Sequence, residues 1–106
     1  MLKVMMGMAA AVLMSVSASA GLKDGETVVF LGDSITQAGA GPTGYVSIFR
    51  DAINKARPNS GINVIGAGIG GNRVPDLEAR LDQDVLSKKP SVVVIYIGIN
   101  DVWHTK

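Results

Sequence analysis

The sequence predicts an α/β protein with a parallel sheet, and three observations support this fold class. Strand-like apolar segments alternate with amphipathic helical segments along the chain. The connections between these segments are short. The last segment, residues 91–99 (SVVVIYIGI), is apolar on both alternating faces, which is typical of a strand buried between two layers. We therefore expect right-handed crossovers, helices on both faces of one sheet, and a position away from the sheet edge for residues 91–99.

The first 20 residues are predicted to be a secretory signal peptide rather than part of the domain. Lys3 precedes an apolar stretch of suitable length, and residues 18–20 (ASA) have the small-x-small pattern of a cleavage site. A retained membrane anchor is the alternative, but a spanning helix needs about 20 apolar residues, and serines interrupt the later part of this stretch. We expect a secreted or periplasmic protein whose domain, residues 21–106, has no membrane span.

Charge and composition indicate which partners this domain can attract and what can stabilise its fold. Loss of Lys3 from the ten basic residues leaves nine, which balance the nine acidic residues. Such a neutral chain has no basic surface to attract nucleic acid or anionic lipid. The chain has no cysteine, so the domain must be held together by its core rather than by disulfides. Its 106 residues leave room for one domain at most.

The first strand and the first long helix are predicted from apolar periodicity. Residues 27–31 are apolar, β-branched or aromatic, which favours a buried strand. After a glycine-rich loop, residues 39–44, apolar residues recur at three-and-four spacing with polar residues opposite. This pattern predicts an amphipathic helix that ends near Arg57, before Pro58. Its apolar positions are Tyr45, Ile48, Phe49, Ala52, Ile53 and Ala56.

A second strand and a second helix follow. Residues 62–65 are predicted as a short strand that enters a glycine-dominated loop. The helix is expected to begin near Pro75, a residue suited to a first helical turn, and to end at Pro90. Its inner face would consist of Leu77, Leu81 and Val85.

All three predicted strands end in small or amide-bearing residues. The segments are GDSIT (residues 32–36), GAGIGGN (residues 66–72) and GIND (residues 98–101). In open parallel sheets, ligands bind in the crevice beyond the carboxyl ends of the strands. We therefore expect these three segments to face one common site.

Together, GDSIT, GAGIGGNR and GIND resemble the GDSL or SGNH hydrolase superfamily, in order and in separation. The resemblance covers essentially all of residues 21–106, and three segments together are far more specific than any one. It implies a flavodoxin-like three-layer α/β/α sandwich, with Ser34 as the nucleophile. It also implies an oxyanion hole formed by the Ser34 backbone amide, the Gly71 backbone amide and the Asn100 side chain. No cofactor or metal ion is implied.

The residue types suit acyl transfer. A tetrahedral oxyanion is stabilised by fixed donors, each worth about 3 kcal/mol. Asn100 supplies an uncharged NH₂ group, and Gly71 can bring its amide close without a side chain in the way. Simpler interpretations exist: Ser34 alone suits a helix cap, and Gly71 suits an ordinary turn. Asp33 and Asp101 are expected to hold loops through nearby amides rather than to act as acids or bases.

Two other signatures compete with this one. Gly66, Gly68 and Gly71 spell GxGxxG, the pattern of a dinucleotide site. However, Pro75 would then fall inside the helix, and the next strand ends without a carboxylate for ribose. The GxSxG nucleophile elbow is also absent, because Thr36 stands where its second glycine should be.

The catalytic base is the missing part. The resemblance implies a DxxH segment well downstream, whereas the sequence stops at Lys106. Residues 101–104 spell DVWH, but Asp101 already belongs to GIND, so His104 is expected at the edge of the cleft or on the surface. Tyr45 and Trp103 are expected to be packing residues, with the crevice as the alternative for Trp103.

We therefore expect the N-terminal portion of a longer hydrolase, incomplete after the third strand. Without a fourth strand beside residues 91–99, that strand would have an exposed apolar edge prone to aggregation. The predicted function is an exported serine esterase acting on acyl groups of sugars, lipids or small alcohols, with a weak preference for carbohydrate esters. The alternative is a non-catalytic binding module with the same crevice. The oligomeric state is not predicted.

Overall fold

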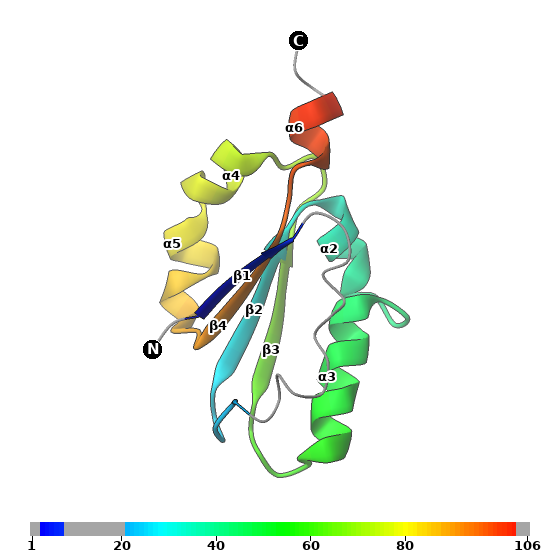
Figure 1. The fold of residues 1–106 in the computed structure, drawn as a ribbon, viewed down its shortest axis with the longest axis vertical. Coiled ribbons are helices and arrows are strands. Elements are labelled where there is room, and N and C mark those ends of the chain that lie inside the picture. Colours follow the sequence, from blue (N-terminus) through cyan, green and yellow to red (C-terminus); the bar gives the residue numbers. More distant parts are fainter. Residues whose placement is uncertain (1–2, 8–20, 104–106) are drawn as a thin grey trace.

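The computed structural model describes residues 3–7 and 21–103, which form a parallel sheet with helices on both faces (Figure 1). This is the predicted three-layer α/β/α arrangement. The strands are β1 (Lys3–Gly7), β2 (Thr27–Gly32), β3 (Asn63–Gly68) and β4 (Val92–Tyr96). The helical elements are α2 (Ser34–Gly39), α3 (Tyr45–Ala56), α4 (Val74–Ala79), α5 (Leu81–Asp84), the 3₁₀ turn η2 (Leu86–Lys88) and α6 (Ile99–Trp103).

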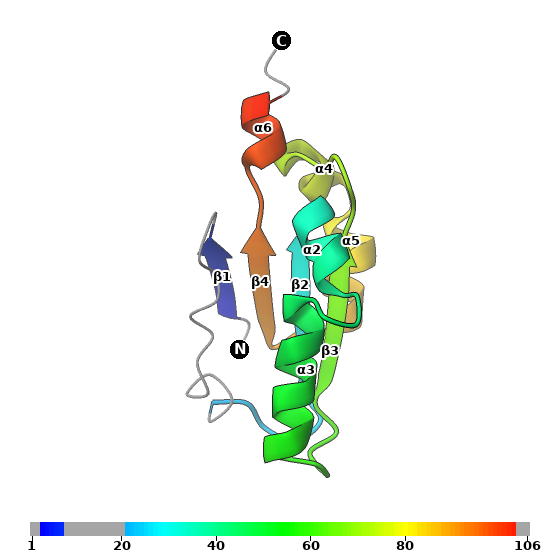
Figure 2. The same cartoon turned by 90° about the vertical axis from the view of Figure 1, so that its right-hand side faces the viewer.

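The strand order is β1-β4-β2-β3, and every pair is parallel. The first predicted strand therefore lies between the second and the third, which is the order of these strands in a flavodoxin-like sheet. The third, β4, has a neighbour on each side, which confirms that it is not an edge strand. Helix α3 covers one face of the sheet, and α4 and α5 cover the other (Figures 1 and 2).

The alternating side chains of β2 explain why both faces need a covering layer. Val28 and Phe30 point into the cluster beneath α3, where Val46 and Ile53 are also buried. The other two apolar residues of the strand point into a second cluster, beneath α4 and α5. That second cluster contains Val29, Leu31, Leu77, Val85, Val93 and Ile97.

The predicted second helix is interrupted. Its expected inner face is present, because Leu77 and Val85 are buried and Leu81 packs against the same cluster. However, residues 74–88 form α4, α5 and η2 instead of one helix. The backbone leaves helical geometry at Arg80, with φ −112° and ψ 10°. Periodicity could not reveal this break, because the apolar spacing runs across it undisturbed.

Strand β1 is an element that the sequence reasoning did not predict. It pairs with β4 over its full length, from Lys3 opposite Val92 to Gly7 opposite Tyr96. The expectation of an exposed edge on β4 is therefore wrong for the whole chain, because β1 occupies that edge. It remains a prediction for a chain that begins at Gly21. The rest of the predicted signal peptide, residues 1–2 and 8–20, lies outside the described residues.

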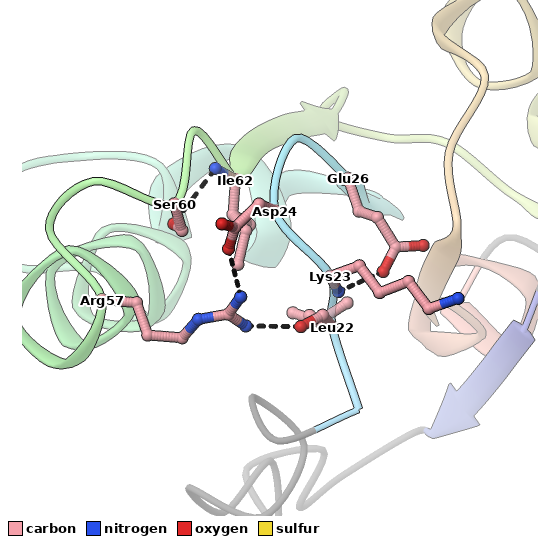
Figure 3. A network of polar contacts seen from close by, with 7 residues as sticks. All are labelled: Leu22, Lys23, Asp24, Glu26, Arg57, Ser60 and Ile62. Atoms are coloured by element: carbon pink, nitrogen blue, oxygen red, sulfur yellow. Dashed lines mark hydrogen bonds and ion pairs between the residues drawn. The ribbon is translucent and has the colours of Figure 1, made fainter.

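The amino ends of β2 and β3 are fastened by polar contacts that start from one arginine (Figure 3). The Arg57 guanidinium, just after α3, donates to the Leu22 carbonyl and pairs with the Asp24 carboxylate. Nearby, the Ser60 hydroxyl accepts a hydrogen bond from the Ile62 amide at 3.2 Å. The Arg57 contacts join the end of α3 to the segment that leads into β2, and the Ser60 contact lies within the segment that leads into β3. Both lie at the end of the sheet opposite the predicted site.

Candidate functional site

The three predicted segments lie together beyond the carboxyl ends of the strands. Helix α2 follows β2, the loop of residues 69–73 follows β3, and α6 follows β4. Figures 1 and 2 show α2, α4 and α6 grouped at this end, toward which the strand arrows point. The parallel direction of the strands is the cause, since it brings all of their carboxyl ends to one side of the sheet.

Ser34 is the first residue of α2, and its side chain is exposed. Asp33, which is fully buried, caps the helix by accepting a hydrogen bond from the Ile35 amide at 2.9 Å. The predicted loop-holding role of Asp33 is thus confirmed, and the interpretation of Ser34 as the helix cap is wrong. With Asp33 as the cap, the Ser34 hydroxyl is not needed to hold the first turn of α2.

The loop after β3 lies directly beside Ser34. The Gly70 amide donates to the Gln37 side-chain oxygen of α2 at 2.7 Å. A Cβ atom placed on Gly70 would lie 3.7 Å from the Ser34 Cβ atom. One placed on Gly68 would lie 2.2 Å from the Gln37 backbone nitrogen, far inside contact distance. Glycine at 68 therefore allows β3 to approach the backbone of α2.

The backbone conformation of Gly71 favours glycine, and the expected approach of its amide to an oxyanion stays a prediction. Its φ is +81°, a left-handed conformation that side chains disfavour, while a Cβ atom there would meet nothing within 4 Å. The close approaches to the segment of Asp33 and α2 are made by Gly68 and Gly70. Gly71 is exposed, and its backbone conformation redirects the loop beside Ser34.

Asn100 is held against this same loop. It is the second residue of α6 and is only 7% exposed. Its side-chain nitrogen donates to the Asn72 carbonyl at 3.0 Å. A primary amide carries two N–H donors, so this bond anchors the group and uses only one of them. Asn100 is thereby bonded to the residue that follows Gly71.

Asp101 also acts on the loop, as predicted. One of its carboxylate oxygens accepts a long hydrogen bond from the Val74 amide, at 3.3 Å. The other oxygen is buried without a partner among the described residues, as is one oxygen of Asp33. Asp33 therefore holds the first turn of α2, and Asp101 holds the start of α4.

Tyr45 fixes α2 against α3. Its hydroxyl is hydrogen-bonded to the Thr36 hydroxyl, and its ring packs on Phe30. Burial raises the pKa of Tyr45, and the hydrogen bond to Thr36 opposes that rise. The predicted packing role of Tyr45 is thus confirmed. The same prediction is wrong for Trp103, which is 72% exposed at the end of α6.

Two residues that tie the site together were missed by sequence reasoning. The Asn72 carbonyl accepts a hydrogen bond from the Asn100 side-chain amide. Arg80 donates hydrogen bonds to the Asn72 side chain and to the Gly32 carbonyl. Only the position of Asn72 next to Gly71 could have indicated its role. His104 lies outside the described residues. Among residues 3–7 and 21–103, no group of acidic, cysteine or histidine side chains is arranged to hold a metal ion.

The arrangement brings the loop after β3 beside Ser34 and bonds the Asn100 side-chain amide to that loop. A backbone loop and a side-chain amide come from two other strand ends and are fixed to each other through Asn72. Such donors stabilise a negative charge that develops on a neighbouring oxygen without having to reorganise.

Comparison with known proteins gives consistent matches. The model of the GDSL-like Lipase/Acylhydrolase family matches residues 30–106. An acetylxylan esterase of Geobacillus stearothermophilus is 46% identical over 91 residues, which are 76% of this chain and 42% of that protein. The crystal structure of the acetyl xylan esterase AlAXEase is 48% identical with a TM-score of 0.69, over 74% of this chain and 40% of that one.

A further solved structure is a catalytic mutant of Axe2, an acetylxylan esterase from Geobacillus stearothermophilus. It has a TM-score of 0.70 and 40% identity, over 79% of this chain and 43% of its own. This chain therefore spans about two fifths of the length of these relatives.

Proposed function

This chain belongs to the GDSL-like lipase/acylhydrolase family, and from that membership we propose that it is part of an exported serine esterase. The enzyme would hydrolyse acyl esters through an acyl-enzyme intermediate. In the first step the Ser34 oxygen bonds to the acyl carbon, the alcohol leaves with a proton, and in the second step water releases the acid.

The observation that carries this proposal is the meeting of three strand ends at one site. Ser34 starts a helix that another residue caps, and the loop carrying Gly71 lies beside it. Asn100 is bonded to that loop through the Asn72 carbonyl. We assign the oxyanion hole to the Ser34 amide, the Gly71 amide and the Asn100 side chain. Each donor of this kind contributes about 3 kcal/mol of transition-state stabilisation.

A histidine base and an aspartate that orients it would complete the machinery. Support comes from the Axe2 relatives, whose catalytic mutants replace a serine, an aspartate or a histidine by alanine. The described residues of this chain include no histidine. The candidate within the sequence is His104, and its spacing from Asn100 argues against that role. We therefore propose that the base comes from a DxxH segment other than residues 101–104.

The proposed substrate is an acyl group carried by a carbohydrate, of the acetylated xylan type. Support comes from the relatives, which are acetylxylan esterases at 40–48% identity. Export is proposed from the signal-like residues 1–20. Within residues 3–7 and 21–103, no helix combines the length and apolar character needed to cross a bilayer.

The alternative is a binding module that keeps the crevice without catalysis. A Ser34→Ala variant separates the two possibilities, with p-nitrophenyl acetate and acetylated xylooligosaccharide as substrates. Under the esterase proposal, this change abolishes turnover and labelling by a fluorophosphonate, while oligosaccharide binding persists. The experiment should compare this chain with any longer reading frame that contains it.

A His104→Ala variant tests the source of the base. We expect turnover and labelling of the active form to persist in this variant. Turnover that survives Ser34→Ala would refute the serine mechanism, and loss of labelling in His104→Ala would make His104 the base.

A further inference from the structure

Arg80 is a largely buried cation that the mechanism above does not use. It lies at the break between α4 and α5, and its side chain is 14% exposed. Three of its nitrogens donate to three different parts of the chain. Nε donates to the Asn72 side-chain oxygen at 2.8 Å, Nη2 to the Gly32 carbonyl at 2.9 Å, and Nη1 to the Asp84 carboxylate at 3.0 Å.

Two of these three partners adjoin the proposed catalytic groups. Gly32 is the last residue of β2, two positions before Ser34. Asn72 follows Gly71, and its carbonyl holds the Asn100 side-chain amide at 3.0 Å. One guanidinium is therefore bonded both to the strand that delivers the nucleophile and to the residue that anchors an oxyanion donor.

The chemistry of arginine suits this task. The guanidinium is planar, and its N–H groups point in fixed directions within one plane. Contacts to Gly32 and Asn72 through this rigid group set the spacing between the end of β2 and the loop after β3. A lysine has one nitrogen on a flexible stem and would not hold both acceptors at a set distance. The Asp84 carboxylate balances the charge, so a buried cation is tolerated here.

We infer that Arg80 is a positioning residue for the oxyanion hole, and this inference rests on the proposed function. It aligns the loop of Gly71 and the Asn100 amide with Ser34. The break between α4 and α5 contributes to this positioning. At the break the backbone of Arg80 is not helical, and from there its side chain reaches Gly32 and Asn72 at the strand ends. Small displacements of groups that contact the reacting atoms lower rates steeply, by about 100-fold for 1 Å.

The test compares Arg80→Lys with Arg57→Lys as a matched control. Arg57 also joins a backbone carbonyl and an aspartate, but at the opposite end of the sheet (Figure 3). In the active form, which includes the proposed DxxH segment, we expect Arg80→Lys to lower kcat by about 10- to 100-fold with little change in KM. We expect Arg57→Lys to lower stability while kcat is kept.

A spectroscopic measurement on the same variants needs no turnover. Arg80→Lys should shift the NMR resonances of the Asn100 side-chain NH₂ and of the Gly71 amide, and Arg57→Lys should not. If Arg80→Lys does not fold, Asn72→Ala removes one acceptor of Arg80 and is expected to shift the same Asn100 resonances.

The outcomes distinguish the two proposals. Unchanged Asn100 and Gly71 resonances, or an unchanged kcat in a destabilised Arg80→Lys protein, would overturn the positioning role. Activity that survives Ser34→Ala would instead refute the proposed function and leave the spectroscopic result standing.

Discussion

At Gly68 the absence of a side chain decides how closely a strand and a helix approach. A Cβ atom there would lie 2.2 Å from the Gln37 nitrogen, 2.6 Å from the Thr36 carbonyl carbon and 2.8 Å from the Asp33 carbonyl oxygen. All three are backbone atoms of the segment that starts α2, so no side chain can rotate away. Single residues of this kind set the position of Ser34 relative to the loop after β3.

We predict that Gly68→Ala destabilises the protein by about 1 to 3 kcal/mol, the usual cost of overpacking. The matched control is Gly66→Ala in the same strand, where the nearest atom would be the Ala40 side-chain carbon at 3.1 Å. Chemical denaturation of both variants measures the difference in unfolding free energy. A cost at Gly66 equal to that at Gly68 would contradict the proposed contact with α2.

At the scale of elements, β1 protects the edge of β4 in the chain that keeps residues 1–20, which the proposed export would remove. The Lys3 amide donates to the Ser91 carbonyl at 2.8 Å, and the register continues to Gly7 opposite Tyr96. Without β1, the apolar strand β4 would present unpaired backbone groups along that edge, as a bare edge strand does. A chain that begins at Gly21 is therefore expected to self-associate unless another strand takes this place.

Proline substitutions test this pairing without changing the chain length. Backbone amides alternate in direction along a strand, so the bond of Lys3 to Ser91 implies that the Met5 amide also points to β4 and the Val4 amide points away. We expect Met5→Pro, which removes a ladder donor, to speed amide exchange in β4 and to increase self-association. Val4→Pro is the control, and it should have a smaller effect on amide exchange in β4 and on self-association. Equal behaviour of the two variants in exchange and light scattering would refute the pairing.

At the scale of the whole molecule, stability should fall in alkali through Tyr45. Burial raises the pKa of Tyr45 above the ordinary value of 10.0, so the folded state holds this proton more tightly than the unfolded state. The contribution of protonated Tyr45 to the free energy of unfolding is fully present below pH 10, and it is lost as the pH rises through the raised pKa of Tyr45.

We predict that Tyr45→Phe lowers the unfolding free energy near neutral pH, because it leaves the buried Thr36 hydroxyl without its tyrosine partner, at a cost of about 1 to 3 kcal/mol. The difference from the wild type should shrink above pH 10. In Thr36→Val, tyrosinate absorbance should appear at higher pH, since the hydrogen bond that lowers the Tyr45 pKa is gone. A difference in unfolding free energy between the wild type and Tyr45→Phe that stays constant as the pH rises above 10 would contradict the role given to the Tyr45 proton.

Much of this architecture follows from the sequence alone. The apolar patterns of residues 27–31, 45–56 and 91–99 require burial at fixed periods, and the strand-helix alternation requires parallel strands whose carboxyl ends share one side. That local physics predicted the fold class and the segments that carry Ser34, Gly71 and Asn100.

Only the tertiary structure decided how those segments are held. The break at Arg80, the capping of α2 by Asp33, the bond between Asn100 and Asn72 and the pairing of β1 with β4 depend on contacts between residues far apart in the chain. Periodicity carries no signal for such contacts, because their energies come from groups that meet only after the sheet has formed.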